Sequence, residues 1–203
     1  MKHRRTATVQ RILGFLIAGS SLMMLPPALV SWWYQDGTAS LFVVSAVILF
    51  LTGLAIFLPV RHTREELRLR EGFLIVAVCW LSLALVGALP FLLLVQPEIS
   101  YVDAVFESMS GLTTTGATIL TNIDGLPRGI LYYRQQLQWL GGLGIVVLAV
   151  AILPMLRIGG MQLYRAETPG PLKDAKLTPR ITETAKALWL IYLGITVVCA
   201  LAY

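Results

Sequence analysis

The chain has 203 residues, of which 57% are hydrophobic and 13% charged, with a formal net charge of +5. Because a soluble domain typically has about 25% charged residues, this composition predicts a polytopic membrane protein whose surface faces lipid. It excludes a soluble enzyme, a disordered tail and a disulfide-stapled secreted domain, since Cys79 and Cys199 each lie inside an apolar run and are typical of small buried side chains.

Four charge-free runs are long enough to cross a membrane as helices, because about 20 apolar residues span about 30 Å of hydrocarbon. They are Ile12–Tyr34, Ala39–Val60, Phe73–Val95 and Gln135–Leu156. The first is too long for a cleavable signal peptide, and Pro26 and Pro27 are expected to kink or end it near the interfacial aromatic residues Trp32–Tyr34. A fifth run, Ala187–Tyr203, has 17 residues and is expected to be a span cut short.

The basic residues are unevenly distributed between the two sides that alternating spans define. Fourteen of the 16 lie in residues 1–11, 61–72 and 157–186, which fall on the same side. Only Arg128 and Arg134 fall on the other, and Arg134 is expected to snorkel outward from the start of its span. The positive-inside rule therefore predicts a cytoplasmic N-terminus, and the basic loops are expected to face the lipid headgroups of the bilayer and not nucleic acid.

The segment between the third and fourth spans is not a hydrophilic loop. Ser100 and Asp103 have the spacing of a helix capping box. The run Tyr101–Ser110 is amphipathic, with apolar residues every three to four positions that define one face: Val102, Val105, Phe106 and Met109. As a helix of about 15 Å it is too short to cross the membrane and long enough to enter it halfway.

The tract that follows, Gly111–Thr118, contains three consecutive threonines and then Gly116. Because β-branched residues disfavour a continued helix and glycine can adopt a positive φ angle, we expect an extended chain. Extended backbone at membrane depth is tolerated where it is buried or lines a water-filled path, and there its oxygens can replace the hydration shell of a cation. The predicted filter is Thr113, Thr114, Thr115, Gly116 and Ala117, acting mostly through backbone oxygens, with the middle three residues as the strongest ligands.

A purely structural role is the alternative to a filter, because Thr/Gly-rich stretches also occur where transmembrane helices pack closely and in exterior turns. A capped half-length helix whose partially negative C-terminus points at the tract, with full spans on both sides, favours the pore loop of a potassium channel. Glu107 in that helix either concentrates cations at the entrance or hydrogen-bonds to filter N–H groups and holds the loop, and we favour the second role. Ser100, Asp103 and Glu107 are thus predicted to support the pore helix.

No catalytic constellation is present. The sequence contains no His-Glu-x-x-His, Walker loop, Cys-x-x-Cys or nucleophile elbow. Both histidines, His3 and His62, fall in segments predicted to be cytoplasmic, so that Ser108 and Ser110 have no histidine on their own side. We therefore expect neither an enzyme nor a cofactor.

Three stretches carry a resemblance to a known family. Phe106–Thr118 (FESMSGLTTTGAT) resembles the first pore loop of the TrkH/TrkG family of bacterial potassium-uptake proteins, which belongs to a superfamily with KtrB and the plant high-affinity potassium transporters. Gln135–Ile145 and Met161–Gly170 resemble the next helix and the cytoplasmic loop of the same family. The resemblance extends over essentially the whole chain, including the two N-terminal spans.

The resemblance implies four pore-loop repeats in one polypeptide around one filter, with Gly116 as the central glycine of the first repeat. Serine at this position accompanies sodium selectivity in the plant branch, so glycine implies potassium permeation. The resemblance also implies a multi-pass protein of the bacterial inner membrane, a homodimer in the complete protein, and a cytosolic nucleotide-binding ring of the TrkA type as partner. Potassium is then the transported ion and no cofactor is needed.

The predicted fold is an all-α polytopic membrane protein with two N-terminal transmembrane helices, one helix–pore-loop–helix unit and the start of a second unit. Residues 1–72 comprise the N-terminal segment, the helical hairpin and a cytoplasmic loop; residues 73–156 are the first repeat, with pore helix and filter at 100–118. Residues 157–186 are a cytoplasmic loop, and residues 187–203 begin a truncated second repeat. One loop supplies a quarter of a filter, so either the chain is a fragment or four copies assemble. Potassium uptake and a non-conducting element that forms a pore wall only with further repeats or subunits both remain open.

Overall fold

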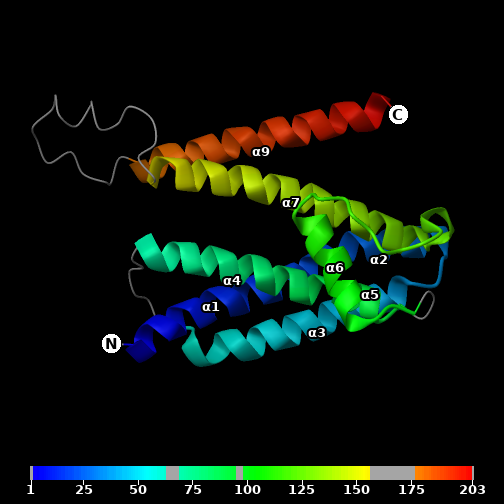
Figure 1. The fold of residues 1–203 in the computed structure, drawn as a ribbon, viewed down its shortest axis with the longest axis horizontal. Helices are drawn as coiled ribbons and strands as arrows, with labels where there is room; N and C mark the ends of the chain where they lie inside the picture. Colours follow the sequence, from blue (N-terminus) through cyan, green and yellow to red (C-terminus); the bar gives the residue numbers. More distant parts are fainter. Residues whose placement is uncertain (1, 63–68, 95–97, 156–176, 203) are drawn as a thin grey trace, which may run out of the picture. The chain divides into compact units, whose positions relative to one another are not determined.

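The computed structural model describes residues 2–62, 69–94, 98–155 and 177–202, and Figure 1 shows them as a ribbon. Within these ranges the chain is helical and contains no strand. The elements are α1 (Lys2–Ser20), η1 (Ser21–Met24), α2 (Leu25–Tyr34), α3 (Ala39–Phe57), η2 (Leu58–Val60), α4 (Leu69–Gly87), α5 (Leu89–Leu92), α6 (Tyr101–Leu112), η3 (Ile123–Gly125), α7 (Arg128–Met155) and α9 (Leu177–Ala202).

Four helical segments among the described residues are long and apolar enough to cross a membrane. They are Ala7–Tyr34, Ala39–Val60, Ile75–Leu92 and Glu183–Ala202. The fourth predicted span, Gln135–Leu156, lies on α7, which begins earlier at Arg128, and Leu156 is outside the described residues. The fifth run is longer than predicted, because the polar residues before Ala187 are also helical. The protein is therefore an all-α polytopic membrane protein.

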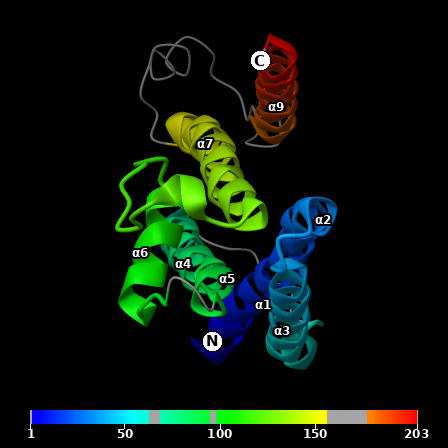
Figure 2. The same ribbon diagram turned by 90° about the vertical axis from the view of Figure 1, so that its right-hand side faces the viewer.

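Two compact units make up the chain, Met1–Gln138 and Trp139–Tyr203, and each is described by itself. The first unit combines the N-terminal hairpin with α6, the predicted pore helix, because α1 packs on both α3 and α4, and α4 packs on α6. Figure 2 shows the short α6 beside α4 in this unit. Residues of this unit from both predicted segments, 1–72 and 73–156, thus share one hydrophobic core.

The proline pair interrupts the first span as predicted. Residues Ser21–Met24 form a 3₁₀ turn, and α2 then begins with Pro26 and Pro27 in its first turn, where a missing N–H does least harm. In the third span, α4 ends at Gly87 and the single turn α5 follows with Pro90 near its start.

The hairpin of α1 and α3 is held by backbone contact through two glycines. A Cβ atom at Gly14 would lie 2.6 Å from the Phe57 nitrogen and 2.9 Å from the Gly53 oxygen, and one at Gly53 would collide with the backbone of Ala18. Small residues at such positions let two membrane helices approach closely enough for dispersion contacts to hold them together.

The core of the first unit surrounds Tyr133 on α7, which is 1% exposed. Its ring packs against Phe42 of α3 and Phe91 of α5, with centroid distances of 5.7 and 5.4 Å. The Tyr133 hydroxyl donates to the Gly87 carbonyl at 2.8 Å, where α4 ends. One α7 side chain therefore joins the hairpin to the first helix of the pore repeat.

The second unit pairs the end of α7 with α9. Trp139 donates from Nε1 to Thr196 Oγ1 at 3.0 Å, and the Tyr192 hydroxyl donates to the Trp139 carbonyl at 3.0 Å. The two aromatic rings lie 5.6 Å apart. Large apolar side chains of α9 such as Leu190 and Leu201 are exposed, as expected for a helix that meets lipid or another apolar partner.

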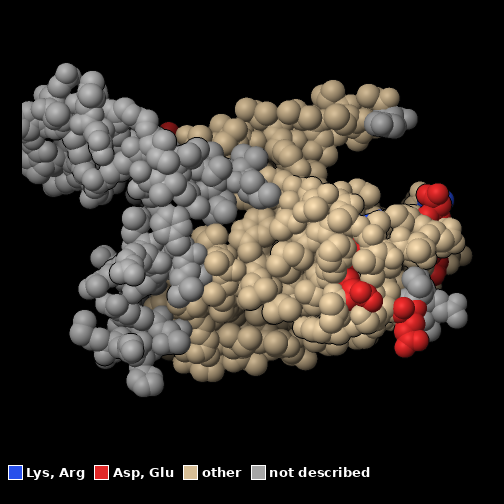
Figure 3. Space-filling view, viewed as in Figure 1, with Lys and Arg blue, Asp and Glu red and all other residues tan. Residues whose placement is uncertain are grey.

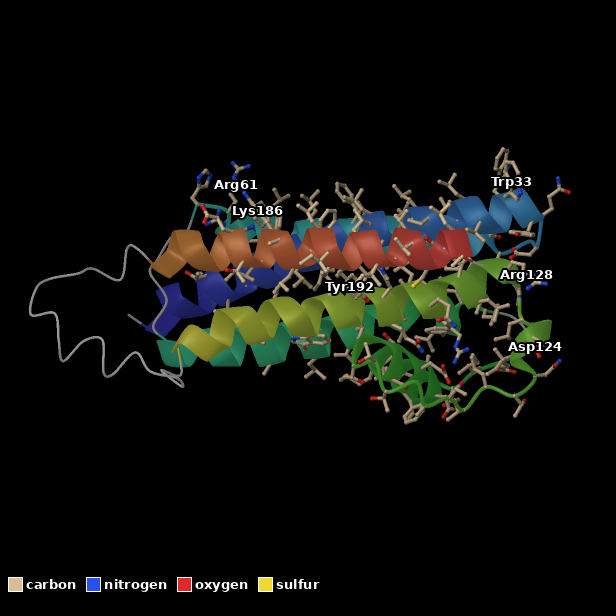
Figure 4. The ribbon with its side chains drawn as sticks, turned by 90° about the horizontal axis from the view of Figure 1, so that it is seen from above. Trp33, Arg61, Asp124, Arg128, Lys186 and Tyr192 are labelled. Carbon is tan, nitrogen blue, oxygen red and sulfur yellow. The ribbon has the colours of Figure 1, made fainter. Side chains whose placement is uncertain are left out.

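Exposed charged side chains lie toward the ends of the first unit. Figure 3 shows a surface almost free of charged side chains along the described part of this unit, with acidic groups toward the end away from the N-terminus. In Figure 4, Trp33, Asp124 and Arg128 lie at one end of the first unit and Arg61 lies at the other. A charge-poor belt between polar ends is what a bilayer requires.

Candidate pore loop

The pore helix α6 begins at the predicted cap. Ser100 has an extended backbone, and its Oγ accepts the Asp103 N–H at 3.2 Å, while its hydroxyl lies 2.6 Å from Asp103 Oδ2. The capping interaction is therefore confirmed. The helix has 12 residues, Tyr101–Leu112, and ends two residues later than predicted. Its length of about 18 Å still crosses only part of a membrane.

The buried face of α6 is not the apolar face that periodicity defines. Val102 and Phe106 are 74% and 43% exposed, whereas the small and polar residues of the opposite face are buried: Ala104, Glu107, Ser108, Ser110 and Gly111. Close approach explains this difference, because a Cβ atom at Gly111 would lie only 3.0 Å from Leu137 Cβ on α7. Of the predicted apolar face, Val102 and Phe106 are exposed, while Val105 and Met109 are partly buried against the core.

α6 ends in a motif with two reversed hydrogen bonds. The Thr115 N–H donates to the Ser110 carbonyl at 3.0 Å, and the Thr114 N–H donates to the Gly111 carbonyl at 2.9 Å. This is the Schellman arrangement, whose left-handed position is usually glycine. Here it is Thr114, with φ of 56°. A β-branched residue in that region costs on the order of 1–3 kcal/mol, which makes the start of the predicted filter a strained segment.

The threonine tract is therefore not extended throughout. Thr113 and Thr114 form a turn, and regular structure is absent from Thr115 to Leu120. Gly116 has a positive φ of 73°, in agreement with the prediction from its residue type. The tract bends because the helix end satisfies its own last carbonyls, which propensity alone does not indicate.

The five predicted filter residues lie together and are exposed on the chain. A Cβ atom at Gly116 would have no atom within 4 Å among the described residues. The threonine hydroxyls bond locally: Thr113 Oγ1 donates to the Met109 carbonyl at 2.8 Å, and Thr114 Oγ1 donates to the Thr113 carbonyl at 2.7 Å. The Ala117 carbonyl accepts the Ser110 hydroxyl at 2.6 Å, which ties the end of the tract to the pore helix.

Glu107 holds the loop from behind. Its side chain is 2% exposed, and Oε1 accepts the Ile119 N–H at 2.7 Å and the Thr118 hydroxyl at 2.5 Å. The carboxylate thus bonds the backbone N–H of Ile119, two residues after the predicted filter ends at Ala117, and its role in supporting a filter stays a prediction. Behind the loop, the space walled by Glu107, Ser110, Ala117 and Arg134 has no room for a water molecule.

Arg134 pairs with Glu107, and its position differs from the predicted outward orientation. It does not snorkel outward: its side chain is 10% exposed, and Nε lies 3.2 Å from Glu107 Oε2. A buried carboxylate needs a partner, and α7 presents Arg134 one turn after Gly129 and Ile130 enter the core. The pairing of two rare intramembrane charges could have been proposed from the sequence, whereas the roles of Ser110 and Thr118 had no separate signal.

The described residues contain no group of three or more His, Cys, Asp or Glu side chains placed to hold a metal ion. The oxygen-rich elements of this unit are instead the backbone and hydroxyl groups of the threonine tract. An all-helical membrane fold in the described residues, with a half-length helix that ends in such a tract, is the architecture that membrane ion-transport proteins use for a pore loop.

Comparison with known proteins identifies the family. Residues 39–203 match the TrkH family model, described as a cation transport protein. The chain belongs to the TrkH family, as its motifs predicted, and it is not an enzyme.

Curated relatives share the sequence over nearly the whole chain. The Trk system potassium uptake protein TrkH of Halomonas elongata is 63% identical over 96% of this chain and 40% of that protein. The TrkH of Escherichia coli K12 is 55% identical over 96% of this chain and 40% of that protein. The TrkG of the same organism is 40% identical over 100% of this chain and 42% of that protein. The crystal structure of the potassium transporter TrkH from Vibrio parahaemolyticus matches with a TM-score of 0.82 at 48% identity, over 100% of this chain and 39% of that chain. The chain thus spans about 40% of the length of these relatives.

Proposed function

We propose that this chain takes part in potassium uptake across the bacterial inner membrane and supplies one wall of a channel-like pore. The filter residues are Thr113, Thr114, Thr115, Gly116 and Ala117, and the oxygens nearest the ion come from Thr114, Thr115 and Gly116. The names of the relatives support potassium as the transported ion. The N-terminus is cytoplasmic, in keeping with the distribution of basic residues.

One observation carries this proposal. The tract after α6 is bonded from behind by Ser110 and Glu107, while its other side is exposed. Such a loop keeps its shape and leaves carbonyl oxygens available on one face. A dehydrated potassium ion needs such oxygens on all sides, so three further loops must complete the ring. They belong either to further repeats of a longer polypeptide or to further copies, and the family resemblance predicts the first, together with a homodimer and a TrkA-type ring.

Rubidium uptake by potassium-starved cells tests the proposal. We expect no uptake from this chain alone, and uptake from a chimera in which it replaces the matching 40% of the Halomonas elongata relative. Uptake from the chain alone would instead support assembly of copies. A chimera that inserts normally and transports nothing would support the second candidate, a non-conducting element.

Substitution of Gly116 tests the placement of the filter. In the chimera, Gly116→Ser should weaken discrimination of rubidium against sodium, because φ of 73° is strained for any side chain and the neighbouring carbonyls shift. Gly19→Ser is the control, because a Cβ atom at this glycine of α1 would have no atom within 4 Å among the described residues and the residue lies outside the loop. If ion preference is unaltered in Gly116→Ser, the filter lies elsewhere.

A further inference from the structure

Asp36 lies in the turn between α2 and α3, and both of its carboxylate oxygens are engaged. Oδ1 accepts the Thr38 N–H at 2.9 Å, the Thr38 hydroxyl at 2.8 Å and the Ser31 hydroxyl. Oδ2 accepts the N–H of Gly129 at 2.7 Å, 93 residues further along the chain. This aspartate therefore connects the N-terminal hairpin to the start of α7.

The bond to Gly129 is a helix cap supplied from a distant segment. α7 begins at Arg128, so the Gly129 N–H is one of the first-turn donors that have no partner inside the helix, and Pro127 before it has no N–H. A carboxylate at this end also meets the positive end of the helix dipole. Asp36 thus caps the N-terminus of α7, a role that a serine or aspartate next to the helix in sequence has at most helices.

The turn between α2 and α3 packs closely against the start of α7 at Gly129. A Cβ atom there would lie 2.8 Å from Ser31 Cβ, 2.9 Å from Thr38 Oγ1 and 3.0 Å from Phe42. Both the hydrogen bond and the close backbone approach therefore fix the start of α7 against the hairpin, and they restrict its sliding and its rotation.

The next turn of α7 carries the residue that holds the pore loop. Arg134, about 7.5 Å along the helix from Gly129, pairs with Glu107 at 3.2 Å, and Glu107 accepts the Ile119 N–H at 2.7 Å. A continuous set of described contacts thus runs from Asp36 through the first turns of α7 to the backbone of Ile119, two residues after the proposed filter.

We propose that Asp36 is a positioning residue for the pore loop. Its carboxylate fixes the position of the start of α7, and α7 then places Arg134, which pairs with Glu107 of α6 behind the filter. The two-helix hairpin is in this way a part of the selectivity apparatus, although it contributes no oxygen to the ion. The inference rests on the proposed function, because the segment being positioned is the proposed filter.

Amide hydrogen exchange of the whole chain in nanodiscs tests the proposal without any transport. Asp36→Asn keeps the size of the side chain but replaces one acceptor oxygen by an amide that cannot accept. Exchange at both Gly129 and Ile119 should become faster, on the order of tenfold, since a hydrogen bond to a charged group is lost. Asp124→Asn is the control, because it removes the same charge from an exposed side chain at the same end of the unit. It should leave both amides unchanged.

The two amides distinguish the proposal from a merely local role. Faster exchange at Gly129 with unchanged exchange at Ile119 would show that Asp36 caps α7 and positions nothing beyond it, which overturns the inference. Unchanged exchange at both would do the same. If Asp36→Asn does not fold, Ser31→Ala removes one donor to the carboxylate and keeps the cap, and the same two amides should then respond to a smaller extent.

Ion preference in the chimera is the second measurement. Asp36→Asn should lower the ratio of rubidium to sodium uptake at equal amounts of inserted protein, and Asp124→Asn should not. A chimera with unaltered residues that fails to transport would count against the proposed function, while the exchange result at Ile119 still decides the role of Asp36.

Discussion

Gln136 on α7 donates from Nε2 to the Met23 carbonyl at 2.7 Å, across 113 residues of sequence. In a regular helix that carbonyl would accept the N–H of residue 27, which is a proline and has none. The side chain thus supplies the donor that the proline removes. In a membrane, where water is absent, a freed carbonyl of this kind requires such a substitute.

Removal of the Gln136 amide should destabilise the chain. Gln136→Leu leaves the Met23 carbonyl without a partner, and the free energy of unfolding should fall by about 1–2 kcal/mol. Thermal unfolding in detergent measures the change, with the exposed neighbour Gln135→Leu as control. In a Pro27→Ala background the helix regains its own N–H, so the same substitution should cost less; an equal cost in both backgrounds would contradict the explanation.

Glu107→Gln should be strongly destabilising, because it leaves the Arg134 guanidinium buried without a counter-charge. The expected loss is about 3–5 kcal/mol in the free energy of unfolding. Combination with Arg134→Met should recover part of it, and the exposed Glu98→Gln should have no measurable effect. A double variant as unstable as the single one would mean that the ion pair is not the cause.

Thr114→Gly should stabilise the end of α6. Glycine has no penalty in the left-handed region, so the free energy of unfolding should rise by about 1 kcal/mol. Thr115→Gly, at a neighbouring position without a positive φ, should be neutral or destabilising. In the chimera, the Thr114→Gly variant should also discriminate less between rubidium and sodium, because the relaxed turn no longer fixes the carbonyl directions. A loss of stability would indicate that the Thr114 hydroxyl outweighs the backbone strain.

The stability of the chain should depend on Asp36 at low pH. Burial acts to raise the pKa of Asp36, but the hydrogen bonds from Ser31, Gly129 and Thr38 outweigh it and lower the pKa below its usual value of 3.8. Because the folded-state pKa is lowered, the stabilisation is present above that usual value and is lost as the pH falls through the folded-state value.

Unfolding in detergent between about pH 6 and pH 2 should therefore show a loss of stability below about pH 4 that Asp36→Asn reduces. Asp124→Asn, on an exposed side chain, is the comparison. An identical pH profile in the unaltered chain and in Asp36→Asn would exclude this linkage.

The sequence predicts best what depends on neighbouring residues. Hydropathy locates the spans because each must satisfy the same lipid environment, and the spacing of Ser100 and Asp103 places the start of α6. The positive φ of Gly116 follows from its lack of a side chain. All three depend on chemistry within a few residues.

What depends on distant partners was missed or predicted wrongly. Arg134 points inward because Glu107 lies across from it, and the buried face of α6 is small and polar because α7 approaches it closely. Thr114 takes a glycine-like conformation that its residue type argues against. In the first two cases the decisive contact lies in another element. At Thr114 it is the end of α6 itself, which satisfies its own last carbonyls, and residue propensity does not indicate that arrangement.

The contact between Gly53 and Ala18 has a consequence for genetics. Every side chain at position 53 must push α1 and α3 apart, because a Cβ atom there would collide with the Ala18 nitrogen. Substitutions there are expected to lower the amount of protein that accumulates in the membrane, and the molecules that do survive quality control should still prefer the same ion. A screen that scores growth alone would not distinguish these variants from variants with an altered filter. Immunoblotting of membranes separates a lower amount of protein from a normal amount of protein with a changed filter.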